Sequence, residues 1–190
     1  MKRNSIRLLT AALLLAGAQQ AYAAGTDAGT SITSTFTVNY DIGGVPQAEL
    51  TPAYTPFVVD RRVNLAVTAD NSPLTVSPNA TDQVLQFTVT NSTNSAIDVG
   101  LAAVDGTGDQ FNPTGVTVFV ESGANAGYLA AEDTATYIDG LAEDDTIVVY
   151  VVSDIPNTAV DNDTGAIVLP ATAKAARVAS TQGADLAEDV

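Results

Sequence analysis

Three groups of acidic residues are the parts of this sequence that could catalyse a reaction or bind an ion. Glu143, Asp144 and Asp145 are consecutive, and a pair of carboxylates is what glycoside hydrolysis requires. That reaction also needs a second, separated acid, and the sequence pattern identifies none. Three adjacent acids before an apolar segment are typical of a hairpin turn or a protected sheet edge. We therefore expect a turn here and no catalytic residue.

The other two acidic groups are candidates for calcium binding. Glu121, Asn125, Glu132 and Asp133 offer the oxygen ligands that Ca²⁺ prefers, but their spacing does not complete a calcium-loop pattern. We expect a solvated acidic loop, with a Ca²⁺ site as the open alternative. Residues 161–165 resemble the start of a calcium loop but lack its third ligand, its bidentate Glu and its flanking helices, so a turn is predicted. No cofactor is expected.

Histidine, cysteine and tryptophan are absent from the chain. Without histidine there is no imidazole acid–base catalysis, no Ser-His-Asp arrangement and no ordinary zinc site. Without cysteine, an exported domain depends on packing, ions or assembly with neighbours for its stability. We therefore predict a protein that is not an enzyme.

The first 23 residues have the three parts of a secretory signal peptide. Lys2, Arg3 and Arg7 precede an apolar run over residues 8–18, and a small-residue Ala-Tyr-Ala triplet ends at Ala23, where cleavage is predicted. The apolar run is too short to span a bilayer. No twin-arginine pair precedes it and no cysteine follows it, so we expect the general secretion route and a secreted or cell-surface location.

The remainder of the chain is strongly acidic. After cleavage it holds four basic and 22 acidic side chains, a net charge of −18. This charge repels phosphate backbones and anionic lipids, so we expect no nucleic-acid partner and no membrane insertion. Arg61 and Arg62 form the one basic pair before the tail, and we expect them to pair with a surface carboxylate.

The chain after the leader at residues 24–30 alternates between apolar and polar side chains. In residues 32–40 the apolar side chains share one parity, which predicts a half-buried strand. Gly43 and Gly44 then predict a hairpin turn, with a short return strand from Val45. An alternative is that the strand over residues 32–40 leaves its own domain and completes the sheet of a neighbour.

Further strands follow at short intervals. Residues 147–152 are continuously apolar, which predicts a central strand covered on both faces. Asn79, Asn91 and Asn162 head Asn-x-Ser/Thr triplets, which are typical of exposed turns. The other segments with alternating apolar residues are 63–69, 85–89, 97–101, 116–120, 135–138 and 167–171.

About eight or nine strands with turns every 8–12 residues are typical of a β-sandwich. We predict an all-β, immunoglobulin-like Greek-key sandwich over residues 31–173, with a jelly roll as the alternative. The signal-peptide helix precedes it, and residues 174–190 are expected to form a polar tail or linker.

Several segments together resemble a known kind of protein. They are TFTVNY (35–40), FVVDRRVNLAV (57–67), VLQFTVTN (84–91), VFV (118–120), TATYIDGL (134–141) and VYVVSDIP (149–156). They resemble the N-terminal region of bacterial exported surface proteins with conserved β-sandwich repeats of unknown function. The resemblance implies a sandwich without chemistry, and a longer protein of which these 190 residues are a fragment. In such proteins a cation loop follows VFV, but here residues 121–128 lack several of its Asp and Asn positions.

These observations favour a non-enzymatic structural or interaction module of the cell surface, such as part of a stalk, adhesin or filament. Its partners would be other proteins or further copies of the same chain. The alternative is an extracellular module that binds Ca²⁺ or a glycan.

Overall fold

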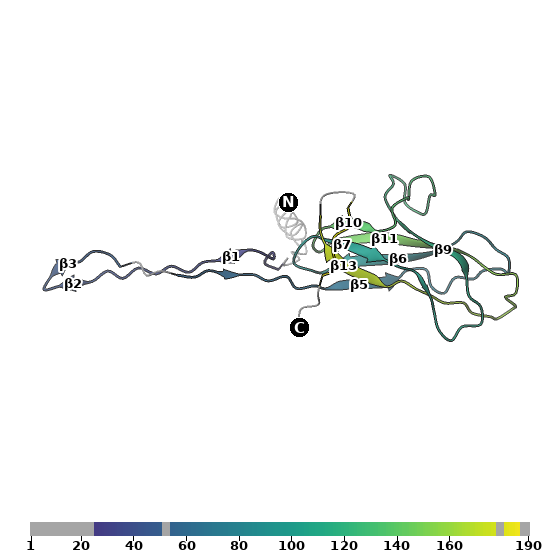
Figure 1. Ribbon diagram of the computed structural model, residues 1–190, viewed down its shortest axis with the longest axis horizontal. Coiled ribbons are helices and arrows are strands. Elements are labelled where there is room, and N and C mark those ends of the chain that lie inside the picture. Colours follow the sequence, from purple (N-terminus) through teal and green to yellow (C-terminus); the bar gives the residue numbers. More distant parts are fainter. Residues whose placement is uncertain (1–24, 51–53, 178–180, 187–190) are drawn as a thin grey trace, which may run out of the picture.

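The computed structural model describes residues 25–50, 54–177 and 181–186, so the predicted signal peptide at residues 1–23 lies outside the described residues. The described part is all-β, as predicted, with an elongated body from which a long, thin arm projects (Figure 1). It contains no helix with the length and apolar character that crossing a membrane requires.

The body consists of two antiparallel sheets. The larger has the strand order β5-β6-β11-β9 and the smaller the order β10-β7-β13. A short pair, β8–β12, lies beside them. The strands of the larger sheet are β5 (Leu65–Ala69), β6 (Gln83–Asn91), β11 (Thr146–Asp154) and β9 (Thr114–Val120). The others are β10 (Ile138–Leu141), β7 (Ile97–Leu101), β13 (Ala171–Ala175), β8 (Val104–Asp105) and β12 (Ile167–Val168).

The core lies between the two sheets. It consists of every second residue of the facing strands, because side chains alternate between the two faces of a strand. On the larger sheet, Val89 and Val149 have no exposed surface, and on the smaller sheet the same holds for Ile97 and Val99. The positions of the apolar residues in these strands therefore correctly predict which face of each strand points into the core.

β11 is a central strand, paired with β6 on one side and β9 on the other. Its inner residues Val149 and Val151 are fully buried, and its outer residue Tyr150 is only 3% exposed. The prediction that residues 147–152 form a strand covered on both faces is confirmed.

Two predicted strands differ in position from the structure. The strand expected at residues 135–138 runs instead over β10, and Ala135 makes a single bridge to Val120. The strand expected from residue 167 is interrupted between β12 and β13. Pro170 lies in that interruption, and proline has no amide hydrogen to donate to a ladder.

The C-terminal segment is attached to the smaller sheet. Lys174 and Ala175, expected to begin a tail or linker, complete β13. The Ala175 amide donates to the Ala184 carbonyl at 2.9 Å, and the Leu186 amide donates to the Ala173 carbonyl at 3.0 Å. Residues 184–186 therefore line the outer edge of β13, and Leu186 packs against the core.

Asn91, at the end of β6, is fully buried, so the expectation of an exposed turn there is wrong. Its Nδ2 donates to the carbonyls of Ser95, Leu141 and Ala142 at 2.9–3.0 Å, and its Oδ1 accepts the Thr93 amide at 2.9 Å. A buried amide is tolerated because all of these groups are paired. This side chain joins the larger sheet to the end of β10.

The arm is a long antiparallel hairpin. It is formed by β1 (Ser31–Ile32) paired with β4 (Phe57–Val58), a bridge between Val38 and Leu50, and β2 (Asp41–Ile42) paired with β3 (Val45–Pro46). Gly43 and Gly44 adopt φ of 61° and 80° at the tip, so the predicted hairpin turn is confirmed. Residues 31–46 contribute no strand to either sheet of the body.

Candidate functional site

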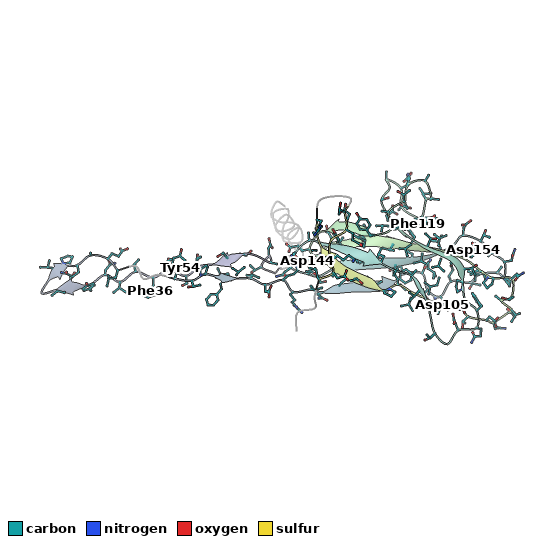
Figure 2. The ribbon with its side chains drawn as sticks, viewed as in Figure 1. Phe36, Tyr54, Asp105, Phe119, Asp144 and Asp154 are labelled. Carbon is teal, nitrogen blue, oxygen red and sulfur yellow. The ribbon has the colours of Figure 1, made fainter. Side chains whose placement is uncertain are left out.

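The arm carries a concentration of exposed apolar side chains. Phe57 is 78% exposed and Phe36 is 65% exposed, and Phe36 and Tyr54 lie well away from the body (Figure 2). The prediction that the strand over residues 32–40 is half-buried is wrong, because no part of the described chain covers its apolar face. The arm contains ten large apolar side chains that are exposed, namely Ile32, Phe36, Val38, Tyr40, Ile42, Val45, Leu50, Tyr54, Phe57 and Val58.

A single side chain holds both strands of the arm where they leave the body. Asn94 Nδ2 donates to the carbonyls of Thr26 and Asp60, each at 3.0 Å. Its Oδ1 accepts the Arg62 amide at 2.8 Å, and its backbone carbonyl accepts the Ala28 amide at 2.9 Å. Asn94 therefore fixes the base of the arm to the turn after β6.

The two arginines lie directly beyond this base. The structure contradicts the expectation that Arg61 and Arg62 pair with a carboxylate, because neither guanidinium forms an ion pair with any described residue. The Nε of Arg61 is shielded from solvent and has no hydrogen-bond partner among them.

A cleft of about 770 Å³ opens at the other end of the body. It is lined by Leu85 and Phe87 of β6, by Ile155 just after β11, and by the loops over residues 71–78 and 160–166. The neighbouring Asp154 and Asp105 lie at the end of the body farthest from the arm (Figure 2). Sequence patterns did not indicate this cleft, because it forms where loops far apart in the chain meet.

The cleft exists because the two sheets differ in length. β6 and β11 are nine residues long, whereas β7, β10 and β13 have five, four and five residues. Asn91 joins β10 to the arm end of β6, so the short strands cover that end. The inner face at the far end, from Phe87 to Gln83, is covered by loops, and these leave a gap.

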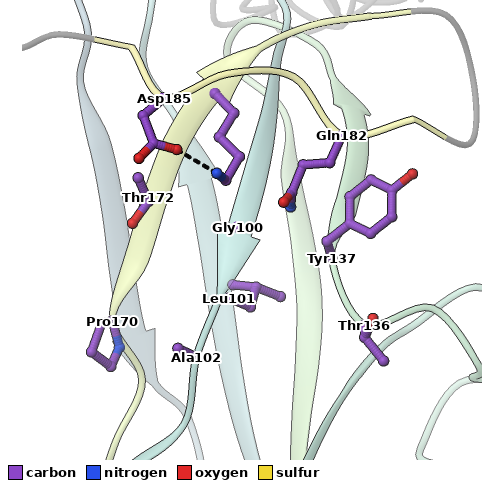
Figure 3. Close-up of a pocket in the computed structure, with 10 residues that line it drawn as sticks. Gly100, Leu101, Ala102, Thr136, Tyr137, Pro170, Thr172, Gln182 and Asp185 are labelled. Carbon is purple, nitrogen blue, oxygen red and sulfur yellow. Dashed lines mark hydrogen bonds and ion pairs between the residues drawn. The ribbon is translucent and has the colours of Figure 1, made fainter.

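A second, shallower hollow of about 400 Å³ lies over the smaller sheet, between Gly100, Tyr137 and Gln182 (Figure 3). Lys174 forms an ion pair with Asp185 at its edge, so this cation is already neutralised. Burial, followed by the charges of Asp139 and Asp98, raises the pKa of Tyr137 above its usual value. Among the described residues that line the hollow, Lys174 and Asp185 are the two charged ones, and they are paired with each other.

The acidic loop over residues 121–133 folds onto the outer face of the larger sheet. There Tyr128 packs between Phe119 and Tyr150, with ring centroids 5.1 Å and 5.9 Å apart. Tyr150 donates its hydroxyl hydrogen to Glu121 Oε2 at 2.7 Å and accepts the Gly127 amide at 3.1 Å. Burial, and then the bond to Glu121, raises the pKa of Tyr150 to about 12.

The carboxylates of this loop are used as acceptors for backbone amides. Asp133 is 1% exposed and accepts the amides of Ser122 at 3.0 Å and Leu129 at 2.8 Å. Glu121 also accepts the amides of Gly123 and Gly127. These bonds give the two buried or half-buried acids a role in holding the loop closed.

The two remaining calcium candidates contact each other: Asn125 Nδ2 donates to Glu132 Oε1 at 2.9 Å. Within the described residues, no group of three or more His, Cys, Asp or Glu side chains is arranged to hold a metal ion. We expect millimolar Ca²⁺, compared with chelator, to leave the thermal unfolding midpoint unchanged. A rise in the midpoint would contradict this expectation, since a ligand that binds only the folded state stabilises it.

The other acidic groups form turns. The Asp144 amide donates to the Asn91 carbonyl at 2.8 Å, and Asp144 adopts a φ of 59°, so the predicted turn before β11 is confirmed. Burial, followed by the nearby carboxyl of Asp27, raises the pKa of Glu143. Residues 161–165 form the other predicted turn, in which Asp163 Oδ2 accepts the Val160 amide at 3.0 Å.

Comparison with protein-family models, curated proteins and solved structures finds no match to this chain.

Proposed function

We propose that this chain is a non-enzymatic structural or interaction module of an exported surface protein, and that it docks onto a protein partner through its arm. The supporting observation is the arm itself, in which ten large apolar side chains are exposed within the 27 residues from Ile32 to Val58. Contiguous exposed apolar surface on a soluble protein marks an interaction site. An isolated two-stranded hairpin is also only marginally stable in water, so the arm gains stability when a partner covers it.

The proposed fold type and the proposed cellular location are both consistent with this role. An immunoglobulin-like Greek-key arrangement of the sandwich and export by the general secretion route remain our proposals for the fold and the location. We favour the structural role over a Ca²⁺- or glycan-binding module because the loop acids hold backbone amides and the chain lacks tryptophan.

The double substitution Phe36→Ser and Phe57→Ser tests the proposal in the exporting cell. Both side chains are exposed, so the body should fold as before, with an unchanged unfolding midpoint. We expect the unsubstituted chain to be retained in high-molecular-mass surface material and the double variant to be released into the medium. The measurement is the ratio of surface-bound to released chain, and we expect it to fall at least tenfold.

A matched control is the pair Thr35→Ser and Thr37→Ser, which alters the polar face of the same strand and should leave retention unchanged. Equal retention of the phenylalanine variant and the unsubstituted chain would show that the arm is not the interaction surface.

A further inference from the structure

The arm leaves the body at one end, and Asp154 and Asp105, which neighbour residues that line the cleft, lie at the other end (Figures 1 and 2). The arm therefore cannot reach the cleft of its own chain, but it can reach that of another copy. Isolated exposed apolar side chains are normal on a surface, whereas a group of them in one place indicates a contact.

Several exposed apolar side chains of the body lie in or next to the cleft. Beyond the arm, the described residues include only six large apolar side chains that are exposed. Leu74 and Val160 lie in the loops that line the cleft, and Val67 lies on β5, which leads away from it. Val104 and Val168 face each other in the β8–β12 pair, next to Ile167 of the cleft lining.

β5 offers a second contact surface because it is an edge strand. It pairs with β6 on one side only, and four of its five residues are exposed. An edge strand presents unpaired amides and carbonyls along its free side, and an incoming strand can bond to them. β5 starts near the base of its own arm and ends at Ala69, which lines the cleft.

The charges also suit a second copy. The chain is strongly acidic overall, but the arm from residue 31 to 59 carries only Asp41 and Glu49, so its entry brings little repulsion. The guanidinium groups of Arg61 and Arg62, which form no ion pair with any described residue, follow at the base of the arm. The cleft wall carries Asp161 and Asp163, which the arginines would meet when the base of the arm reaches the cleft.

We propose that the partner is a second copy of this chain, with the part of one arm nearest its body, around Phe57, in the cleft of the next copy and the arm tip along the free edge of its β5. This inference rests on the proposed function. An arm strand of about 13 residues spans about 40 Å, longer than the cleft can hold, so the remaining length lies along β5. Because the two surfaces are different and lie at opposite ends, the contact repeats head to tail and builds an open chain of copies.

Cysteine cross-linking tests the contact directly, since the chain has no cysteine of its own. One preparation of the full chain carries Thr55→Cys in the arm, two residues before Phe57, and a second carries Val160→Cys in the cleft wall, where the native side chain is 66% exposed. After mixing and treatment with a short bis-maleimide, we expect dimers between the two preparations. Their yield should be at least tenfold above that with the control Thr136→Cys, an exposed position in the hollow over the smaller sheet.

A chain that carries both Thr55→Cys and Val160→Cys should give a ladder of oligomers. A yield no higher than the Thr136→Cys control, or a dominant product that joins two Thr55→Cys chains, would overturn the inference. If surface retention still depends on Phe36 and Phe57 in that case, the arm binds a different protein and only the identity of the partner is wrong. Equal circular dichroism spectra of all preparations would establish that each variant is folded.

Discussion

Replacement of Asn91 by alanine should lower the free energy of unfolding by about 3–5 kcal/mol, because it leaves a set of buried and half-buried backbone groups without hydrogen bonds. The Asn91 side chain donates to three carbonyls and accepts one amide, with no exposed surface. Two of the carbonyls, those of Leu141 and Ala142, belong to β10 and the turn after it. The loss therefore weakens the connection between the two sheets as well as the end of β6. Urea denaturation at pH 7 measures the change.

Asn125→Ala is the matched control for this substitution. Asn125 is exposed and makes one side-chain bond, to Glu132, so its loss should change the unfolding free energy by about 0.5 kcal/mol or less. Equal effects of the two substitutions would contradict the role given to Asn91.

Replacement of Tyr150 by phenylalanine should cost about 1.5–3 kcal/mol at pH 7, because Tyr150 donates to the carboxylate of Glu121. The pKa of the Tyr150 hydroxyl is about 12 in the folded chain, above its ordinary value of 10.0. The neutral hydroxyl thus favours the folded state, and its contribution is complete below about pH 10 and is lost as the pH rises from 10 to 12. The difference between the two proteins should therefore narrow over that range.

Tyr128→Phe separates this effect from the loss of any tyrosine hydroxyl. Tyr128 packs against the same ring, but its hydroxyl has no hydrogen-bond partner among the described residues, so only a small change is expected at pH 7. A difference for Tyr150→Phe that stays constant from pH 7 to 12 would show that ionisation of this hydroxyl is not coupled to folding. Urea denaturation across the pH range provides the measurement.

The alternation of apolar and polar residues predicts much of the body, because it shows directly which face of each strand is buried. The parity of residues 85–89 and the continuous apolar run at 147–152 identify β6 and β11 as they occur. The tandem glycines at the arm tip are equally informative, since the turn requires positive φ at both positions. Each of these features depends on residues that are close together in the sequence, so the local sequence is enough to predict it.

The alternation of apolar and polar residues does not show which other part of a protein covers the apolar face of a strand. The segment over residues 32–40 has the same alternation as a strand in the core, and yet the body of the same chain leaves it uncovered. The hairpin predicted from Gly43 and Gly44 is present, but both of its strands project from the body together, and the alternative that this strand completes the sheet of a neighbour stays a prediction. An apolar face can be buried within its own chain or against another chain. Which of the two occurs depends on tertiary and intermolecular contacts, and the alternation of apolar and polar residues carries no information about those contacts.

The asparagines illustrate the other limit of the sequence. Asn91 and Asn94 lie in a polar stretch that is typical of an exposed turn, and their partners are distant in sequence, such as Ala142 for Asn91 and Asp60 for Asn94. The same residue type is compatible with a solvated turn and with a fully bonded buried amide. Only the tertiary arrangement distinguishes the two.

The path of the chain from the arm into β5 determines how the body would respond to pulling. The return strand of the arm continues through Arg61 and Arg62 into β5, and arm and strand run in the same direction (Figure 1). β5 is paired with β6 from Leu65 opposite Asn91 to Ala69 opposite Phe87, and these hydrogen bonds are perpendicular to the strands. Tension along the arm therefore shears the whole ladder at once instead of peeling it open pair by pair, which makes the junction between arm and body resistant to force along the long axis.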